Sequence, residues 1–185
     1  IYDRGGNNPS RIDPERVDRL DYLLACLKKR GIYYTTDVYV SRRNIPAAEL
    51  GSAGAIATPA EYKALFYIND DVYADWKRWA KAFLTRVNPH TGLALKDDPA
   101  LITLSLVNEG NPDSWWNRSP RAMPLYNARF AEWKKTHTNG TFVEFLSELT
   151  SGRYRQMAEF LRGLGCRALL TDQNFLCNLP LAASR

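Results

Sequence analysis

One acidic residue of this sequence stands at a position suited to proton-transfer chemistry. Glu109 lies two residues after the largely apolar run Leu101–Val107, in the stretch Leu-Val-Asn-Glu-Gly-Asn at residues 106–111. The run is typical of a buried strand, and alternation along it places Thr103, Ser105, Val107 and Glu109 on one face. A carboxylic acid with a pKa raised toward neutrality can protonate a leaving oxygen and later deprotonate water. From the residues alone, Glu109 is therefore either a catalytic carboxylate at the mouth of the fold or a cap on the segment that follows.

The elements that must position this residue are buried strands, each preceded by a helix. Strand-like segments span residues 32–40, 101–107 and 166–172. Asp13 and Pro14 are typical of a helix start, and Gly31 and Gly165 each end a helix that leads into a strand. The intervening helices are predicted at residues 14–30, 61–66, 72–87, 125–135 and, on either side of Gly152, 142–149 and 154–164.

Alternating helices and strands predict an α/β fold with a parallel sheet, which is either open or closed into a barrel. The sequence has no glycine-rich turn of the nucleotide-binding kind, and this favours the barrel. We expect Ile102, Leu104 and Leu106 to face the surrounding helices, and all helices to cover one side of the sheet. A complete barrel takes about 250 residues, so 185 residues predict a partial (β/α)₈ TIM barrel.

The segment around Glu109 resembles a known family. Residues 97–111, Asp-Asp-Pro-Ala-Leu-Ile-Thr-Leu-Ser-Leu-Val-Asn-Glu-Gly-Asn, are similar to the fourth-strand region of clan A glycoside hydrolases, in particular the cellulase-like family 5 group. Residues 88–92 and 27–40 resemble the preceding turn and the third-strand unit. The resemblance implies that residues 1–185 form a single partial catalytic domain, without its first and last strands.

The family resemblance also implies a reaction. The chain would belong to a retaining hydrolase of O-glycosidic bonds in a β-linked polysaccharide or oligosaccharide, located outside the cell or in the periplasm. Glu109 would be the acid/base, and Asn108 would hold a sugar hydroxyl if a β-bulge turned both side chains to the substrate. Tyr39 stands where many relatives have a substrate-contacting His. The nucleophile, which lies about 5–5.5 Å from the acid/base in retaining enzymes, is expected outside this chain, since Asp172 is a poor substitute.

Other polar and aromatic residues follow the strand ends. Trp115 and Trp116 come soon after Glu109 and either stack on sugar or cover the rim of the barrel. Arg42 and Asn174 either donate hydrogen bonds to sugar hydroxyls or have structural roles.

Several functional classes are excluded or disfavoured by composition. The 25 basic and 20 acidic residues are spread along the chain, so we expect no nucleic-acid partner. Two His residues and three Cys residues, Cys26, Cys166 and Cys177, show no metal-ligand spacing, so neither a metal nor a cofactor is expected. No run approaches the roughly 18 apolar residues of a membrane span. The oligomeric state stays open.

Two alternative functions remain. The missing nucleophile fits a carbohydrate-binding barrel protein that has lost catalysis. Asp37, Glu109 and Asp172, as inward acids on three strands, instead fit the metal site of a non-glycosidase α/β-barrel enzyme.

Overall fold

In the part of the chain that the structure describes, the sheet contains three parallel strands that are neighbours in the order of the sequence. The computed structural model describes residues 12–171. Its strands are β1 (Tyr34–Tyr39), β2 (Leu101–Val107) and β3 (Leu169–Thr171), in the order β1-β2-β3. The predicted parallel order is confirmed, and the middle strand has the bounds expected from the sequence. The third strand, predicted from residue 166, begins at Leu169, and its predicted end at Asp172 lies outside the described residues.

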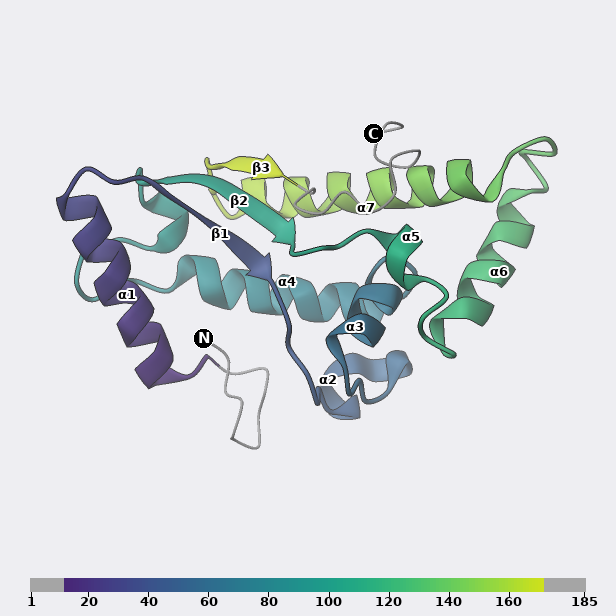
Figure 1. Ribbon diagram of the computed structural model, residues 1–185, viewed down its shortest axis with the longest axis horizontal. Coiled ribbons are helices and arrows are strands. Elements are labelled where there is room, and N and C mark those ends of the chain that lie inside the picture. Colours follow the sequence, from purple (N-terminus) through teal and green to yellow (C-terminus); the bar gives the residue numbers. More distant parts are fainter. Residues whose placement is uncertain (1–11, 172–185) are drawn as a thin grey trace.

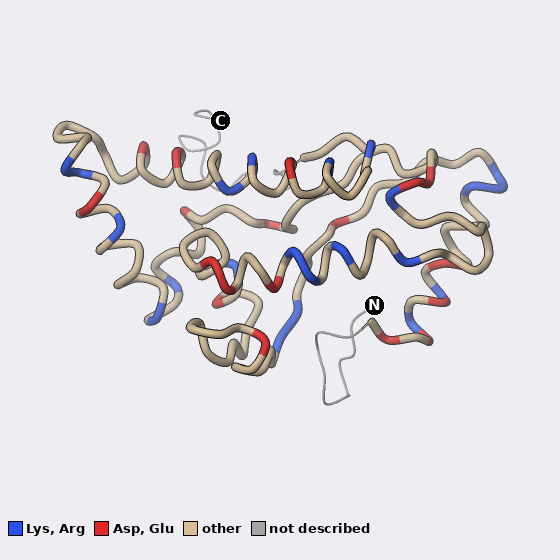
Figure 2. Tube along the Cα trace, turned by 180° about the vertical axis from the view of Figure 1, so that it is seen from behind, with Lys and Arg blue, Asp and Glu red and all other residues tan. Residues whose placement is uncertain are grey.

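Three long helices cover one face of this sheet, and shorter ones gather near the carboxyl ends of its strands. Figure 1 shows β1 crossing in front of α4, and Figure 2, seen from behind, shows α4 and α7 in front of the strands. The first helix also packs on this face, because its Leu24 lines a small cavity with Tyr34 of β1 and Phe83 of α4. The long helices are α1 (Pro14–Lys29), α4 (Asp70–Thr85) and α7 (Phe142–Gly163).

Local sequence explains where these helices begin. The Asp13 side chain accepts a hydrogen bond from the Arg16 backbone and caps α1. Thr141 and Glu144 form a capping box at the start of α7. The two helical segments predicted on either side of Gly152 form one continuous helix of 22 residues, because a single glycine weakens a helix by only about 1 kcal/mol and tertiary packing overrides it.

The register of the strands divides the sheet into two faces. Thr35 pairs with Thr103, which pairs with Leu169, and Asp37 pairs with Ser105 in the next row on the same face. This face turns away from the long helices, and Leu169 is 67% exposed on it.

Ile102 departs from the predicted alternation. Leu104 and Leu106 are buried on the helix side as expected, but Ile102 is 45% exposed. The register shifts between Tyr34 and Thr35, so that β2 has one extra residue there, as in a β-bulge. The prediction that Ile102 faces the helices was therefore wrong.

The connections that follow β1 and β2 carry the short helices. Tyr39 leads into α2 (Ala47–Leu50), the 3₁₀ turn η1 (Gly51–Ala53) and α3 (Pro59–Phe66), and η2 (Leu95–Asp97) precedes β2. After β2 come α5 (Pro112–Trp115) and α6 (Ala122–Trp133). Helix α3 contacts α5, so the two connections meet beyond the carboxyl ends of the strands (Figure 1).

A three-stranded parallel sheet with helices on one face is compatible with a partial barrel, although the strands do not close into one within residues 12–171. Cys26 and Cys166 are free thiols, whereas Cys177 lies outside the described residues. In the described part of the chain, no helix is both long and apolar enough to cross a membrane.

Candidate active site

Glu109 lies two residues beyond the carboxyl end of the middle strand. The Asn108 backbone N–H donates a 2.8 Å hydrogen bond to the Tyr39 carbonyl, so the ladder between β1 and β2 continues for one residue after Val107. Glu109 then adopts a left-handed backbone with φ of 51°, a conformation that only a few per cent of non-glycine residues show. The β-bulge expected at this strand end is replaced by this turn, which ends the alternation at Glu109.

The carboxylate of Glu109 faces a buried cation from the neighbouring connection. Lys63 of α3 places its Nζ 3.8 Å from Oε2 of Glu109; the lysine side chain is 5% exposed and the glutamate side chain 46%. The same Nζ lies 4.9 Å from the centroid of the Trp115 ring. The Trp115 indole N–H in turn donates a 2.7 Å hydrogen bond to the Glu109 carbonyl. Lys63 and Trp115 therefore contact the side chain and the backbone of Glu109, respectively.

The surroundings of Lys63 disfavour the charged form of its side chain. Burial lowers the pKa of Lys63, and the negative charges of Glu109 and Asp37 oppose this effect without cancelling it. Asp37 lies on β1, on the sheet face that turns away from the long helices. Two carboxylates from the ends of adjacent strands thus interact with one ammonium group.

The residue after Glu109 is fixed by two tyrosines. The hydroxyl of Tyr67, at the end of α3, donates a hydrogen bond to the Gly110 carbonyl, and the hydroxyl of Tyr154, on α7, donates one of 3.2 Å to the same oxygen. A side chain at Gly110 has no room, since an added Cβ would lie 2.7 Å from Cβ of Val107 and 2.8 Å from the Tyr67 oxygen. Contacts from α3 and α7 therefore set the path of the chain directly after the candidate acid/base.

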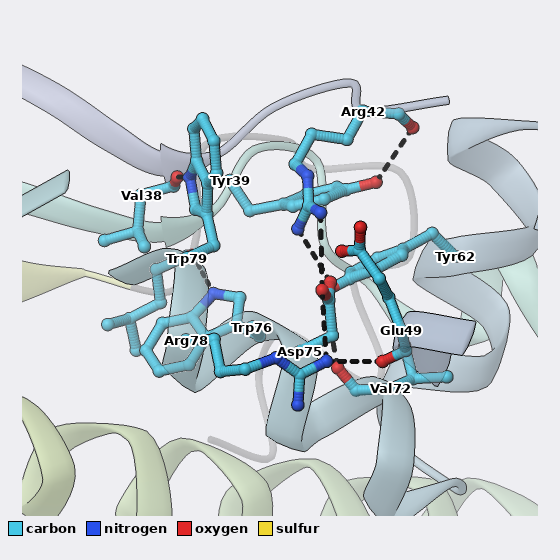
Figure 3. A network of polar contacts seen from close by, with 11 residues as sticks. Val38, Tyr39, Arg42, Glu49, Tyr62, Val72, Asp75, Trp76, Arg78 and Trp79 are labelled. Atoms are coloured by element: carbon cyan, nitrogen blue, oxygen red, sulfur yellow. Dashed lines mark hydrogen bonds and ion pairs between the residues drawn. The ribbon is translucent and has the colours of Figure 1, made fainter. Parts of the chain in front are cut away.

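Two of the predicted substrate-binding residues belong to a buried network (Figure 3). Arg42 is 1% exposed and donates hydrogen bonds of 2.7 and 3.3 Å to the two carboxylate oxygens of Asp75 on α4. Tyr39 is fully buried, stacks on Tyr62 at 4.2 Å, and donates a 3.3 Å hydrogen bond to the Arg42 carbonyl. The predicted contacts of Tyr39 and Arg42 with sugar are therefore not supported by this structure, because both side chains are enclosed by protein. The structural alternative for Arg42, an ion pair, is the arrangement observed.

The network also holds the connection that carries Lys63. The Tyr62 hydroxyl donates a 2.9 Å hydrogen bond to Asp75, which anchors α3 to α4. Burial raises the pKa of Tyr62 well above its ordinary value, with a further contribution from the negative charge of Asp75. Tyr62 therefore remains a neutral hydroxyl donor, and the residue next to it is Lys63.

The two tryptophans have different surroundings. Trp115 contacts Glu109 and is also approached by Arg118, whose guanidinium carbon lies 5.0 Å from the ring centroid. Trp116 packs against Tyr126 of α6 and Phe142 of α7, with ring centroids 6.2 and 4.6 Å away. Its position fits the alternative of a cover over the rim, while only Trp115 is brought to Glu109.

The remaining predicted residues are less informative. Asn108 is partly buried in the turn beside Glu109, and its contact with a sugar hydroxyl stays a prediction. Asn174 and Asp172 lie outside the described residues. No group of three or more His, Cys, Asp or Glu side chains that could hold a metal ion occurs among residues 12–171.

Sequence reasoning missed Lys63, Tyr67 and Tyr154 as parts of the site. A signal was present for Lys63, because it is the one charged residue in the apolar segment Tyr62–Phe66 of a short helix. Such a lysine is buried together with its neighbours and requires a partner. Nothing in the sequence indicates that this partner is Glu109.

Comparisons with known proteins add an independent observation. No family model matches the chain. Over 124 residues, 61% of this chain, it is 30% identical to mannan endo-1,4-beta-mannosidase 3 of Oryza sativa subsp. japonica. Over 118 residues, 58% of the chain, it is 29% identical to mannan endo-1,4-beta-mannosidase 4 of the same plant. The matched regions cover 26% and 25% of these relatives, so the chain spans about a quarter of their length. The similarity supports a relationship to the glycoside hydrolases.

Proposed function

We propose that this chain is part of a retaining glycoside hydrolase that cleaves a β-linked polysaccharide, with Glu109 as its general acid/base. The observation that carries the proposal is the position of Glu109. It follows the middle strand of a parallel sheet at the carboxyl end, where barrel enzymes place their catalytic groups, and its side chain is half-exposed. The similarity to two plant mannan endo-1,4-beta-mannosidases makes a β-1,4-linked mannan the substrate to test first.

In the proposed reaction, Glu109 acts twice. It first protonates the glycosidic oxygen while a second carboxylate attacks the anomeric carbon, so that the leaving group departs as a neutral alcohol. It then removes a proton from the water that hydrolyses the glycosyl-enzyme. The second carboxylate is proposed to lie outside this chain, on a strand that would complete the barrel. Asn108 is proposed to bind a sugar hydroxyl beside the reacting bond.

The experiment compares this chain with a longer form that includes the flanking coding sequence. Both are assayed for release of reducing ends from soluble β-mannan and β-glucan. The 185-residue chain should be inactive and the longer form active, because double displacement requires both carboxylates. Hydrolysis by the 185-residue chain would place the nucleophile within it. A longer form that binds mannan but does not hydrolyse it would instead support the carbohydrate-binding alternative.

A further inference from the structure

Stability does not explain the position of Lys63. Its side chain is 5% exposed, whereas that of its partner Glu109 is 46% exposed, so only the ammonium of this pair has been removed from water. Removing a charge from water is unfavourable unless its partners compensate fully. They do not compensate here, because the pKa of Lys63 is lowered even in the presence of Glu109 and Asp37. Burial therefore disfavours the charged form of Lys63 even beside these two carboxylates.

We propose that Lys63 is a positioning residue for Glu109. Its ammonium holds the side chain of Glu109 in one place at the end of β2. This inference rests on the proposed function, since the place of this side chain matters for catalysis only if Glu109 is the acid/base. It stands on the 3.8 Å separation of Nζ and Oε2 and on the enclosure of the amine.

The groups around the amine leave it few other positions. Asp37 acts on it from β1, Glu109 from the turn after β2, and the Trp115 ring from α5. Attraction between the cation and the ring face keeps the amine against α5. The Trp115 indole also donates a hydrogen bond to the Glu109 carbonyl, so one residue of α5 contacts both the amine and the backbone of the acid. The ammonium is thus preorganised, which is the condition under which a charge stabilises a reacting group without reorganisation.

The first test detects the pair in the 185-residue chain and needs no catalytic activity. The Nζ signal of Lys63 is titrated by ¹⁵N NMR and assigned with Lys63→Arg. Glu109→Gln removes one attracting charge and should lower the pKa of Lys63 further. Glu61→Gln is the matched control, because Glu61 lies two residues away on α3 but pairs with Arg121 at 2.9 Å. A Lys63 pKa that is the same in wild type and Glu109→Gln would overturn the proposal.

The second test separates positioning from a structural role. Lys63→Met keeps the length of the side chain and removes the charge, so the melting temperature should stay the same or rise. The side-chain carboxyl ¹³C signal of Glu109 should nevertheless move toward that of a solvated glutamate, and Lys63→Arg should reverse this change. A melting temperature lowered by several degrees with an unchanged Glu109 signal would mean that Lys63 only packs the fold.

Catalysis by the longer form then distinguishes this inference from the proposed function. Lys63→Met should lower kcat about tenfold with little change in KM, because a misplaced catalytic group loses rate and not substrate binding. Lys63→Arg should recover part of the loss. An active enzyme whose kcat is unaffected by Lys63→Met would refute the positioning role alone. If the longer form has no activity while the titration shows the pair, the proposed function fails, and with it the catalytic purpose of the pair.

Discussion

Arg42→Met should destabilise the chain strongly, because it leaves a carboxylate enclosed without its main partner. Arg42 and Asp75 side chains are each 2% exposed and lie 2.7 Å apart. Removing one member of such a buried pair usually lowers the free energy of unfolding by about 3–5 kcal/mol. Tyr62 still donates a hydrogen bond to Asp75, and Arg78 lies 3.5 Å from it. We therefore expect a loss at the lower end of that range, about 3 kcal/mol.

The assay is urea unfolding, monitored by circular dichroism and tryptophan fluorescence. The slope of the unfolding free energy against urea concentration is compared between variants. Arg78→Met is the matched control, since Arg78 approaches the same carboxylate but is 56% exposed and should contribute less than about 1 kcal/mol. The double variant Arg42→Met/Asp75→Leu should recover most of the loss, because no buried charge remains. If Arg42→Met alone does not fold, a folded double variant tests the same reasoning. Equal, small losses for Arg42→Met and Arg78→Met would refute the reasoning.

Further predictions concern the site and one helix. Gly110→Ala should lower the free energy of unfolding by about 1–3 kcal/mol in urea unfolding, because the added Cβ meets Val107 and the Tyr67 oxygen; no loss would mean that the turn relaxes. Thr141→Ala removes the capping box of α7 and should lower thermal stability by about 1 kcal/mol, with Thr138→Ala as the control outside the helix. Folding lowers the pKa of Lys63 from its ordinary value of 10.5. At pH values between the folded and the unfolded pKa, the unfolded state therefore binds more protons. In that range the contribution of Lys63 to the free energy of unfolding rises with pH. The difference in unfolding free energy between wild type and Lys63→Met should show this rise, and a flat difference from pH 7 to 10.5 would contradict it.

Much of the fold could be predicted because its signals are local. The run Leu101–Val107 is apolar except for Thr103 and Ser105, and the glycines at positions 31 and 165 end helices before strands. The capping residue Asp13 predicted the start of α1 in the same way, whereas the capping box of Thr141 and Glu144 at the start of α7 was not predicted. Ile102 was misplaced because a shift of register depends on the pairing of two strands, which one segment of sequence does not reveal.

The candidate site was predicted only in part, because burial decides which polar residues face a substrate. Arg42 follows a strand end, as a sugar-binding residue would, yet it is enclosed through its pairing with Asp75 from a helix 33 residues further along the chain. Lys63 and Glu109 are likewise separated by 46 residues and meet only because α3 folds over the end of β2. Contacts between residues this far apart in the sequence are set by tertiary packing, which local sequence patterns do not show.

The dependence of hydrolysis on the leaving group tests the role of Glu109 most directly. In the longer form of the protein, Glu109→Ala is assayed on two substrates, an unactivated β-1,4-mannooligosaccharide and a dinitrophenyl β-mannoside. The dinitrophenolate of the second substrate is a stable leaving group and departs without being protonated. The rate of glycosidic-bond cleavage should fall by about 10²- to 10⁴-fold for the oligosaccharide and far less for the aryl glycoside. Equal losses on both substrates would exclude proton donation by Glu109, and a fully active variant would exclude Glu109 from catalysis.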